Sequence, residues 1–168
     1  MLKKHFLPFA LRQAQDEREK MYFREMSKSM ELLETYEHHG DGYNPFLITP
    51  TWQIAQLNYL PEQGFRSLTK IDRHLETDEA FVLFSGTAVL IVAEEVEGSL
   101  TLYTTPMEPE KTYNVPKNVW HNIALAEDAR VLIVENSNTH LGDFEFRDLN
   151  EQEKSELEQQ LTPYFKEG

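Results

Sequence analysis

Two histidines and two carboxylates are spaced so that they could share one metal ion. Asp72 and His74 are two residues apart, so an extended chain places both side chains on one face of a strand. Glu79 follows after a turn and opens the apolar segment 80–84. An acid that points inward from such a strand needs a partner. With His121 as the second imidazole, this set suits zinc, manganese, iron or nickel.

His121 lies on the apolar face of its segment. By alternation it shares that face with Val119, Ile123 and Leu125, so we expect it to point into the core. A buried histidine is more often a hydrogen-bonded core residue than a metal ligand. The position of His121 alone therefore leaves both interpretations open.

The two acids and the neighbouring cations also have ordinary explanations. Asp72 could pair with Lys70 or Arg73, and Glu79 could be a turn residue that faces water. Taken singly, each residue favours such an explanation. A metal site requires Asp72, Glu79 and both histidines to converge on one point.

Arg66 and Lys70 are the cations placed to meet a substrate carboxylate. If the segment before Asp72 is extended, both share the strand face of His74. Arginine binds a carboxylate through two parallel hydrogen bonds. The alternative is a salt bridge to one of the two acids. We treat Arg66, Lys70 and Glu79 as candidate catalytic residues, with Glu79 moving a proton if it is not a ligand.

Short apolar segments with a period of two residues must position these side chains. Turn signals such as Ser85-Gly86 and Glu97-Gly98 separate them. Many short strands with little helix between them predict an antiparallel sandwich or barrel. The predicted strands are 52–60, 65–72, 80–84, 87–93, 99–105, 119–126 and 130–135.

Helices are predicted at both ends of the chain. Residues 11–38 contain no glycine or proline, and Gly40 ends the run. This helix either packs on its own domain or serves as an exchanged or dimerising arm. Residues 149–165 predict an acidic amphipathic helix that Asn150 or Asp148 could cap.

Charge divides the 168 residues into three zones. Residues 1–39 are balanced, residues 40–142 carry a net charge of −8, and residues 143–168 carry −5. The change of period falls at similar places. The predicted regions are a helical extension (1–45), a β-barrel (46–142) and an acidic C-terminal helix (143–168).

The composition excludes several classes of protein. A net charge of −13 argues against binding to nucleic acid or to an anionic membrane surface. The chain has no run of 18 apolar residues, and its first residues do not read as a signal peptide. It also has no cysteine, which excludes disulfides and thiolate chemistry. We expect a cytoplasmic protein that acts on a small molecule.

The spacing of the candidate ligands resembles the first motif of the cupin superfamily. That motif has two histidines separated by one residue, then a glutamate and, after six intervening residues, a turn glycine. Here Asp72 and His74 are followed by Glu79 and by Gly86 at these spacings. Asp72 stands where the cupin motif has its first histidine.

The second cupin motif has a matching stretch at the expected distance. Its proline, glycine and histidine correspond to Pro116, Asn118 and His121, with asparagine at the turn. The resemblance implies an all-β, double-stranded β-helix (jelly-roll) barrel, which the predicted long N-terminal and short C-terminal helices would flank. It also implies a divalent metal on four ligands: Asp72, His74, Glu79 and His121.

Shorter matches resemble the ureidoglycolate lyases within this superfamily. They are Asp72-Arg73-His74, Ala80-Phe81, Asn114 and Val119-Trp120-His121. Those enzymes release urea and leave glyoxylate. The long N-terminal helix and the position of Glu79 depart from that family.

Two functions follow as hypotheses. The first is a metal-dependent lyase or isomerase that acts on a small polar carboxylate or a sugar-like substrate. The second is a non-catalytic cupin that binds or senses a small ligand. We also expect a homodimer, because sheet edges need cover and the 11–38 helix offers an apolar stripe.

Overall fold

The protein consists of two compact units, one up to Tyr36 and one from Glu37 onward. A computed structural model describes residues 9–165, with side chains from residue 15 onward except that of Met30. The boundaries expected at 45/46 and 142/143 stay a division of the sequence by charge and period. The homodimer also stays a prediction. None of the described helices is long and apolar enough to span a membrane.

The described part of the first unit contains one helix, α1 (Phe9–Leu32). Its last backbone bond runs from the amide of Leu33 to the carbonyl of Ser29, and the next residues have no regular structure. The helix predicted over 11–38 therefore ends six residues early. Thr35 and Tyr36 are weak helix formers, and the Tyr36 hydroxyl donates a local hydrogen bond to Glu34. No glycine or proline is needed to end the helix there.

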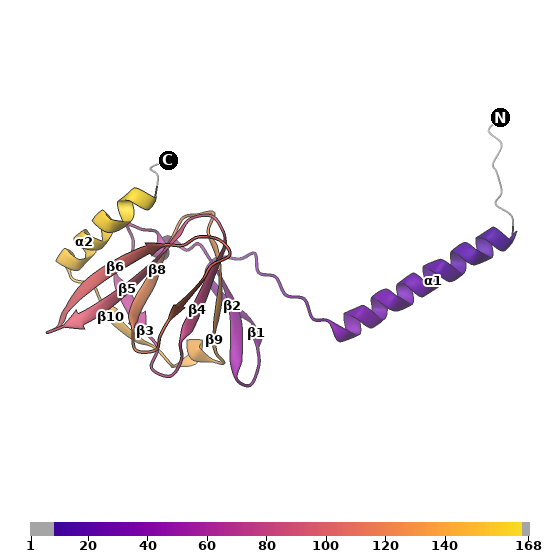
Figure 1. The fold of residues 1–168 in the computed structure, drawn as a ribbon, viewed down its shortest axis with the longest axis horizontal. Helices are drawn as coiled ribbons and strands as arrows, with labels where there is room; N and C mark the ends of the chain where they lie inside the picture. Colours follow the sequence, from indigo (N-terminus) through magenta and orange to yellow (C-terminus); the bar gives the residue numbers. More distant parts are fainter. Residues whose placement is uncertain (1–8, 166–168) are drawn as a thin grey trace, which may run out of the picture. The chain divides into compact units, whose positions relative to one another are not determined.

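Two five-stranded antiparallel sheets form the second unit (Figure 1). The first sheet has the order β1 (Tyr43–Ile48), β2 (Trp52–Asn58), β9 (Arg130–Asn136), β4 (Glu79–Ser85), β7 (Thr112–Val115). The second has the order β10 (Glu145–Asp148), β3 (Lys70–Arg73), β8 (Trp120–Leu125), β5 (Ala88–Val96), β6 (Ser99–Pro106). The remaining elements are α2 (Glu151–Leu161) and three 3₁₀ turns, η1 (Pro61–Gln63), η2 (Thr139–Leu141) and η3 (Thr162–Tyr164).

The strand pairing is nested, as in one long hairpin wound into a barrel. β5 pairs with β6, β4 with β7, β3 with β8 and β2 with β9. Each outer pair encloses the inner ones in the sequence, which is the topology of a jelly roll. The predicted all-β jelly-roll barrel with flanking helices is confirmed. The sequence prediction missed β1, β7 and β10, and residues 65–69 are not extended.

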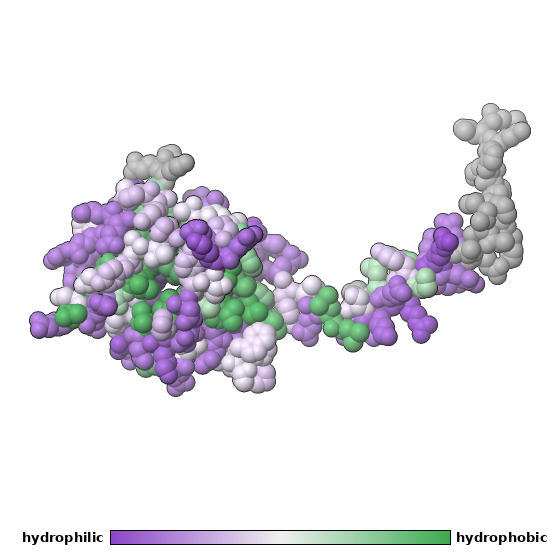
Figure 2. Space-filling model, viewed as in Figure 1, coloured by the Kyte–Doolittle hydropathy of each residue, from purple (hydrophilic) through white to green (hydrophobic). Residues whose placement is uncertain are grey.

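Two apolar layers hold this unit together. Inside the barrel, side chains such as Phe81, Ile123 and Ile133 pack between the sheets. On the outer face of the second sheet, Leu157 and Leu161 of α2 pack with the residues of β5, β6 and β8. β5 and β8 are thus buried on both faces over most of their length. In Figure 2, hydrophilic residues border apolar atoms on the visible face of this unit.

A reciprocal capping box begins α2, and of the two predicted caps, Asn150 and Asp148, the first is the N-cap. The Asn150 side chain accepts from the Glu153 amide, and the Glu153 carboxylate accepts from the Asn150 amide. Glu153 also accepts hydrogen bonds from Arg147 and from the amide of Leu100 in β6. Its buried charge therefore ties the helix to the second sheet.

Tight turns at the motif positions bring the strands back to the site. Asn118 has a φ of 66°, so the asparagine that replaces a turn glycine adopts the left-handed conformation. Gly86 has a φ of 78°, and a Cβ there would clash with the backbone of Asp128 and Ala129. Gly86 thus meets two constraints, a left-handed backbone and a close approach.

Gly86→Ala should lower the free energy of unfolding by roughly 2–4 kcal/mol, because strain and overpacking add. Gly98→Ala is the matched control, since Gly98 has a φ of 83° and nothing within 4 Å of its Cβ position. That control should lose only about 1 kcal/mol. Urea denaturation of both variants measures the difference, and equal losses would contradict the close approach at Gly86.

Candidate metal centre

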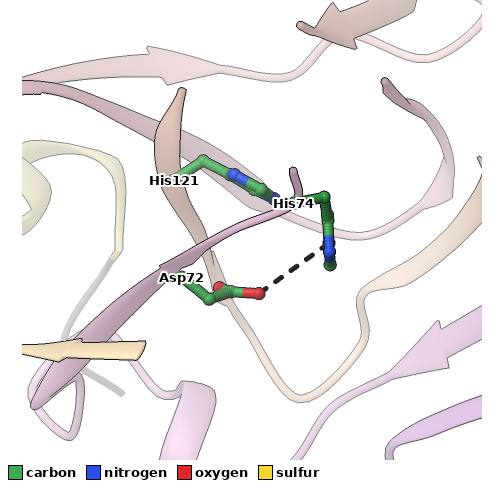
Figure 3. A group of neighbouring side chains, drawn as sticks. All are labelled: Asp72, His74 and His121. Atoms are coloured by element: carbon green, nitrogen blue, oxygen red, sulfur yellow. Dashed lines mark ion pairs between the residues drawn. The ribbon is translucent and has the colours of Figure 1, made fainter. Parts of the chain in front are cut away.

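Three strands carry the four candidate ligands to the inside of the barrel. Asp72 lies in β3, and His74 follows directly after that strand. Glu79 is the first residue of β4, and His121 is the second residue of β8. The register sets Asp72 directly opposite His121, so the two are cross-strand neighbours. His74 points into the same space as Asp72 and His121 (Figure 3).

Glu79 lies between the two imidazoles. Its Oε2 is 2.7 Å from the Nε2 of His121 and 3.2 Å from the Nε2 of His74. All three side chains are buried. Asp72 is half-buried, and its Oδ2 is 3.9 Å from the Nε2 of His74 (Figure 3). The structure therefore brings together all four residues that the motifs single out.

Backbone carbonyls fix the orientation of both histidines. The Nδ1 of His121 lies 2.9 Å from the carbonyl oxygen of Val119, and the Nδ1 of His74 bonds the carbonyl oxygen of Asp143. A carbonyl oxygen only accepts, so each Nδ1 carries a proton. In a neutral ring the Nε2 then carries a lone pair. That lone pair is directed at an oxygen of the Glu79 carboxylate, which also has only lone pairs, so the two repel each other. Such a cluster needs a positive charge at its centre, from protons on Nε2 or from a metal cation.

Without a metal, the cluster is a carboxylate between two imidazolium ions. Burial lowers the pKa of His74, but the hydrogen bond to Glu79, the Asp143 carbonyl and the nearby acids outweigh it and raise this pKa to about 9. The same balance of burial and Glu79 raises the pKa of His121. Burial raises the pKa of Glu79, but the two histidines outweigh it and lower the pKa overall. Burial raises the pKa of Asp72.

The four residues open onto a cavity of about 990 Å³. Apolar side chains of the barrel, including Leu57, Phe81 and Ile133, line much of it. Phe144, directly before β10, and Phe146, within β10, also line it. The candidate ligands are thus accessible to a small molecule while their surroundings remain largely apolar.

Comparisons with known proteins give matches among solved structures alone. No protein-family model matches the sequence, and no curated protein does. A cupin-2 domain protein from Shewanella frigidimarina is 15% identical over 66% of this chain and 91% of that one, with a TM-score of 0.41. KdgF from Halomonas sp. is 14% identical over 62% and 87% respectively, with a TM-score of 0.40. Oxalate decarboxylase from Bacillus subtilis is 13% identical over 72% and 30%, with a TM-score of 0.43.

The decisive observation is the nested jelly-roll pairing with the residues of both motifs meeting inside one barrel. The chain has the cupin fold. The sequence resemblance to the cupins is thereby confirmed at the level of the fold. Identities this low carry no substrate or metal from the matched structures to this chain.

A second polar cluster in this barrel escaped the sequence analysis. Glu135 of β9 accepts hydrogen bonds from the Tyr43 hydroxyl and, at 2.9 Å, from the Nε2 of Gln53. That Nε2 also lies 3.2 Å from the Nδ1 of His140. Burial and the charge of Glu79 raise the pKa of Glu135. Ligand atoms of Glu135, Glu79 and one histidine, His74, lie within 4.8 Å of one another.

The signal for Glu135 was present in the sequence. It ends the inward face of β9 after Val131 and Ile133, just as Glu79 opens an apolar strand. Its partner Gln53 lies opposite it in the β2–β9 register, 82 residues away in the chain. The acid could be found by alternation, whereas its partner required knowledge of the strand pairing.

Arg66 does not reach the cavity. Its Nε lies 3.3 Å from the Oε1 of Glu158 in α2, and it is not among the described residues that line the cavity. The physical reason is that β3 begins only at Lys70, so the alternation assumed back to Arg66 is interrupted. Lys70 does line the cavity, with its Nζ 3.9 Å from the ring centroid of Phe146.

Proposed function

We propose that this cupin is a metal-dependent enzyme acting on a small molecule, as a lyase or an isomerase. Its divalent metal, zinc, manganese, iron or nickel, would be held by His74, Glu79 and His121, with Asp72 as the fourth ligand. One observation carries this proposal. Two Nε2 atoms, each oriented by a carbonyl on its Nδ1, point at one carboxylate oxygen. Metal-binding histidines are oriented in this way.

A bound metal would supply Lewis acidity toward a carbonyl, carboxylate or hydroxyl oxygen of the ligand. The protein's own residues divide the remaining work. Glu79 is enclosed by the histidines, so Glu135 is the carboxyl group placed to exchange a proton with a ligand in the cavity. Tyr43 and Gln53 hold that carboxyl in place. Lyases and isomerases both need such a proton transfer.

Removing one imidazole tests the metal site. His121→Ala should lower metal content by at least about tenfold, because a ligand and its oriented lone pair are lost together. Elemental analysis of protein purified without an affinity tag or chelator measures this. His39→Ala is the control, since His39 is exposed and its side chain bonds Glu37, two residues away and far from the cluster in the sequence. Equal metal content in parent and His121→Ala would overturn the metal assignment.

One observation favours the non-catalytic alternative. Glu79 already accepts hydrogen bonds from both histidines, so the cluster is electrostatically satisfied when they are protonated. In that case the cavity would bind a small ligand beside an ion cluster without catalysis.

Ureidoglycolate is the first substrate to assay for the enzyme, because the segments 72–74 and 119–121 resemble those of ureidoglycolate lyases. The readout is the release of urea.

A further inference from the structure

We propose that the cavity selects ligands with at most one negative charge and with an aromatic or other planar apolar body that packs on Phe144 and Phe146. The oxygen-bearing end of such a ligand faces the four motif residues. This inference rests on the proposed function, since a divalent cation enters the charge balance below. It names the ligand class that the motifs leave open.

The charge balance of the cavity disfavours dianions. The described residues that line it include one lysine, Lys70. Four of them carry carboxylates: Glu62, Asp72, Glu79 and Glu135. A divalent cation on neutral imidazoles would leave this lining with one net negative charge. The whole chain carries a further excess, at −13. A dicarboxylate would meet repulsion from both, and that repulsion is strong in a partly apolar cavity.

Lys70 offers little compensation to an incoming anion. Its ammonium group lies over the ring of Phe146 at 3.9 Å, where the face of the ring attracts it. It is also close enough to Asp72 to oppose the rise that burial causes in the pKa of that acid. Its charge is therefore shared between partners that the protein already contains.

An aromatic pair lies beside the candidate ligands. Phe144 and Phe146 are 38% and 54% exposed, and their ring centroids are 5.1 Å apart. In the β10–β3 register Phe146 is directly opposite Asp72, so the rings begin one strand away from the polar centre. Exposed aromatic side chains that line a cavity are typical of ligand sites.

The size of the cavity indicates the same ligand. About 990 Å³ is at the upper end of the range for drug-sized ligands, roughly 300–1,000 Å³. A two-carbon acid at the polar end would leave the apolar lining, including Leu57, Phe81 and Ile133, in contact with water. A ligand with an apolar body covers that lining and gains the burial.

Four probes separate the effects of body and charge. Mandelate and glycolate are hydroxy acids with one charge, with and without a phenyl group. Phenylmalonate and malonate are the corresponding dianions. Calorimetric titration of the full-length protein, with its metal content measured on the same sample, should give a dissociation constant for mandelate about tenfold below that for glycolate.

Variants assign each preference to its residues. Phe146→Ala should reduce the preference for mandelate over glycolate, measured as the ratio of their dissociation constants, to about threefold or less. Phe84→Ala should leave it unchanged, since Phe84 is an exposed aromatic residue that does not line the cavity. Glu135→Gln removes one negative charge at constant volume, so it should improve phenylmalonate binding about tenfold relative to mandelate.

The results distinguish this inference from the proposed function. Equal binding of mandelate and glycolate by metal-loaded protein, or no change in their ratio in Phe146→Ala, overturns the apolar body. Preferred binding of phenylmalonate that Glu135→Gln does not alter overturns the charge selection. If the protein lacks metal but still prefers mandelate, the preference for an apolar body is supported and the proposed metal-dependent function is contradicted. If the protein lacks both metal and this preference, the inference and the proposed function are both contradicted.

Discussion

Glu79→Ala should lower the free energy of unfolding by about 3–5 kcal/mol, the cost of breaking a buried ion pair by removing one partner. The carboxylate is buried and bonds the Nε2 atoms of His74 and His121. Without it, two imidazolium ions that each donate from Nδ1 to a carbonyl would face one another with only the half-buried Asp72 nearby as a counter-charge. Urea denaturation of metal-free protein measures the loss. In the metal-loaded protein the same change also removes a ligand, so metal content should fall.

Two further variants control this experiment. Glu76→Ala removes an exposed carboxylate three residues away in the same turn, and it should change stability by less than about 0.5 kcal/mol. Glu79→Gln keeps the volume, and its amide can donate to one imidazole lone pair, so it should lose less stability than alanine while still losing metal. A Glu79→Ala protein as stable as its parent would show that the cluster contributes nothing to the fold.

The alternation of side chains along a strand correctly predicted the orientation of His121. It placed His121 on the face of β8 that enters the barrel, with Ile123 and Leu125, and the structure buries these residues together. It could do so because β8 is regular over its whole length. The same argument applied before β3 failed for Arg66, since residues 65–69 are not extended and alternation has no meaning there.

Contacts between distant segments were beyond the reach of any local pattern. His74 is oriented by the carbonyl of Asp143, whose carboxylate also accepts from the amides of Leu75 and Glu76. These partners are 67 to 69 residues apart in the chain. They meet because β10 pairs with β3, and β10 is a four-residue strand with no clear alternation of its own. A short edge strand takes its structure from its partner, so its own sequence predicts it poorly.

Chelated protein should lose stability as the pH rises from about 6.5 through about 9. The folded protein raises the pKa of His74 to about 9, above its ordinary value of 6.5, and raises that of His121 as well. A group with a raised pKa stabilises the fold fully below its unfolded pKa, and that contribution disappears as the pH passes the folded pKa. For His74 the loss is about 3 kcal/mol at most. Thermal unfolding in the presence of a chelator, between pH 6 and 9.5, measures it.

Metal-loaded protein should keep its stability over the same range. Ligation requires neutral imidazoles, so metal competes with protons on His74 and His121, and it binds more tightly as these protons leave. The difference in melting temperature between loaded and chelated protein should therefore widen with pH. His39→Gln is the control, since His39 is exposed and lies outside the cluster. A difference that stays constant between pH 6 and 9.5 would contradict the competition, because the metal would then be bound away from these two imidazoles.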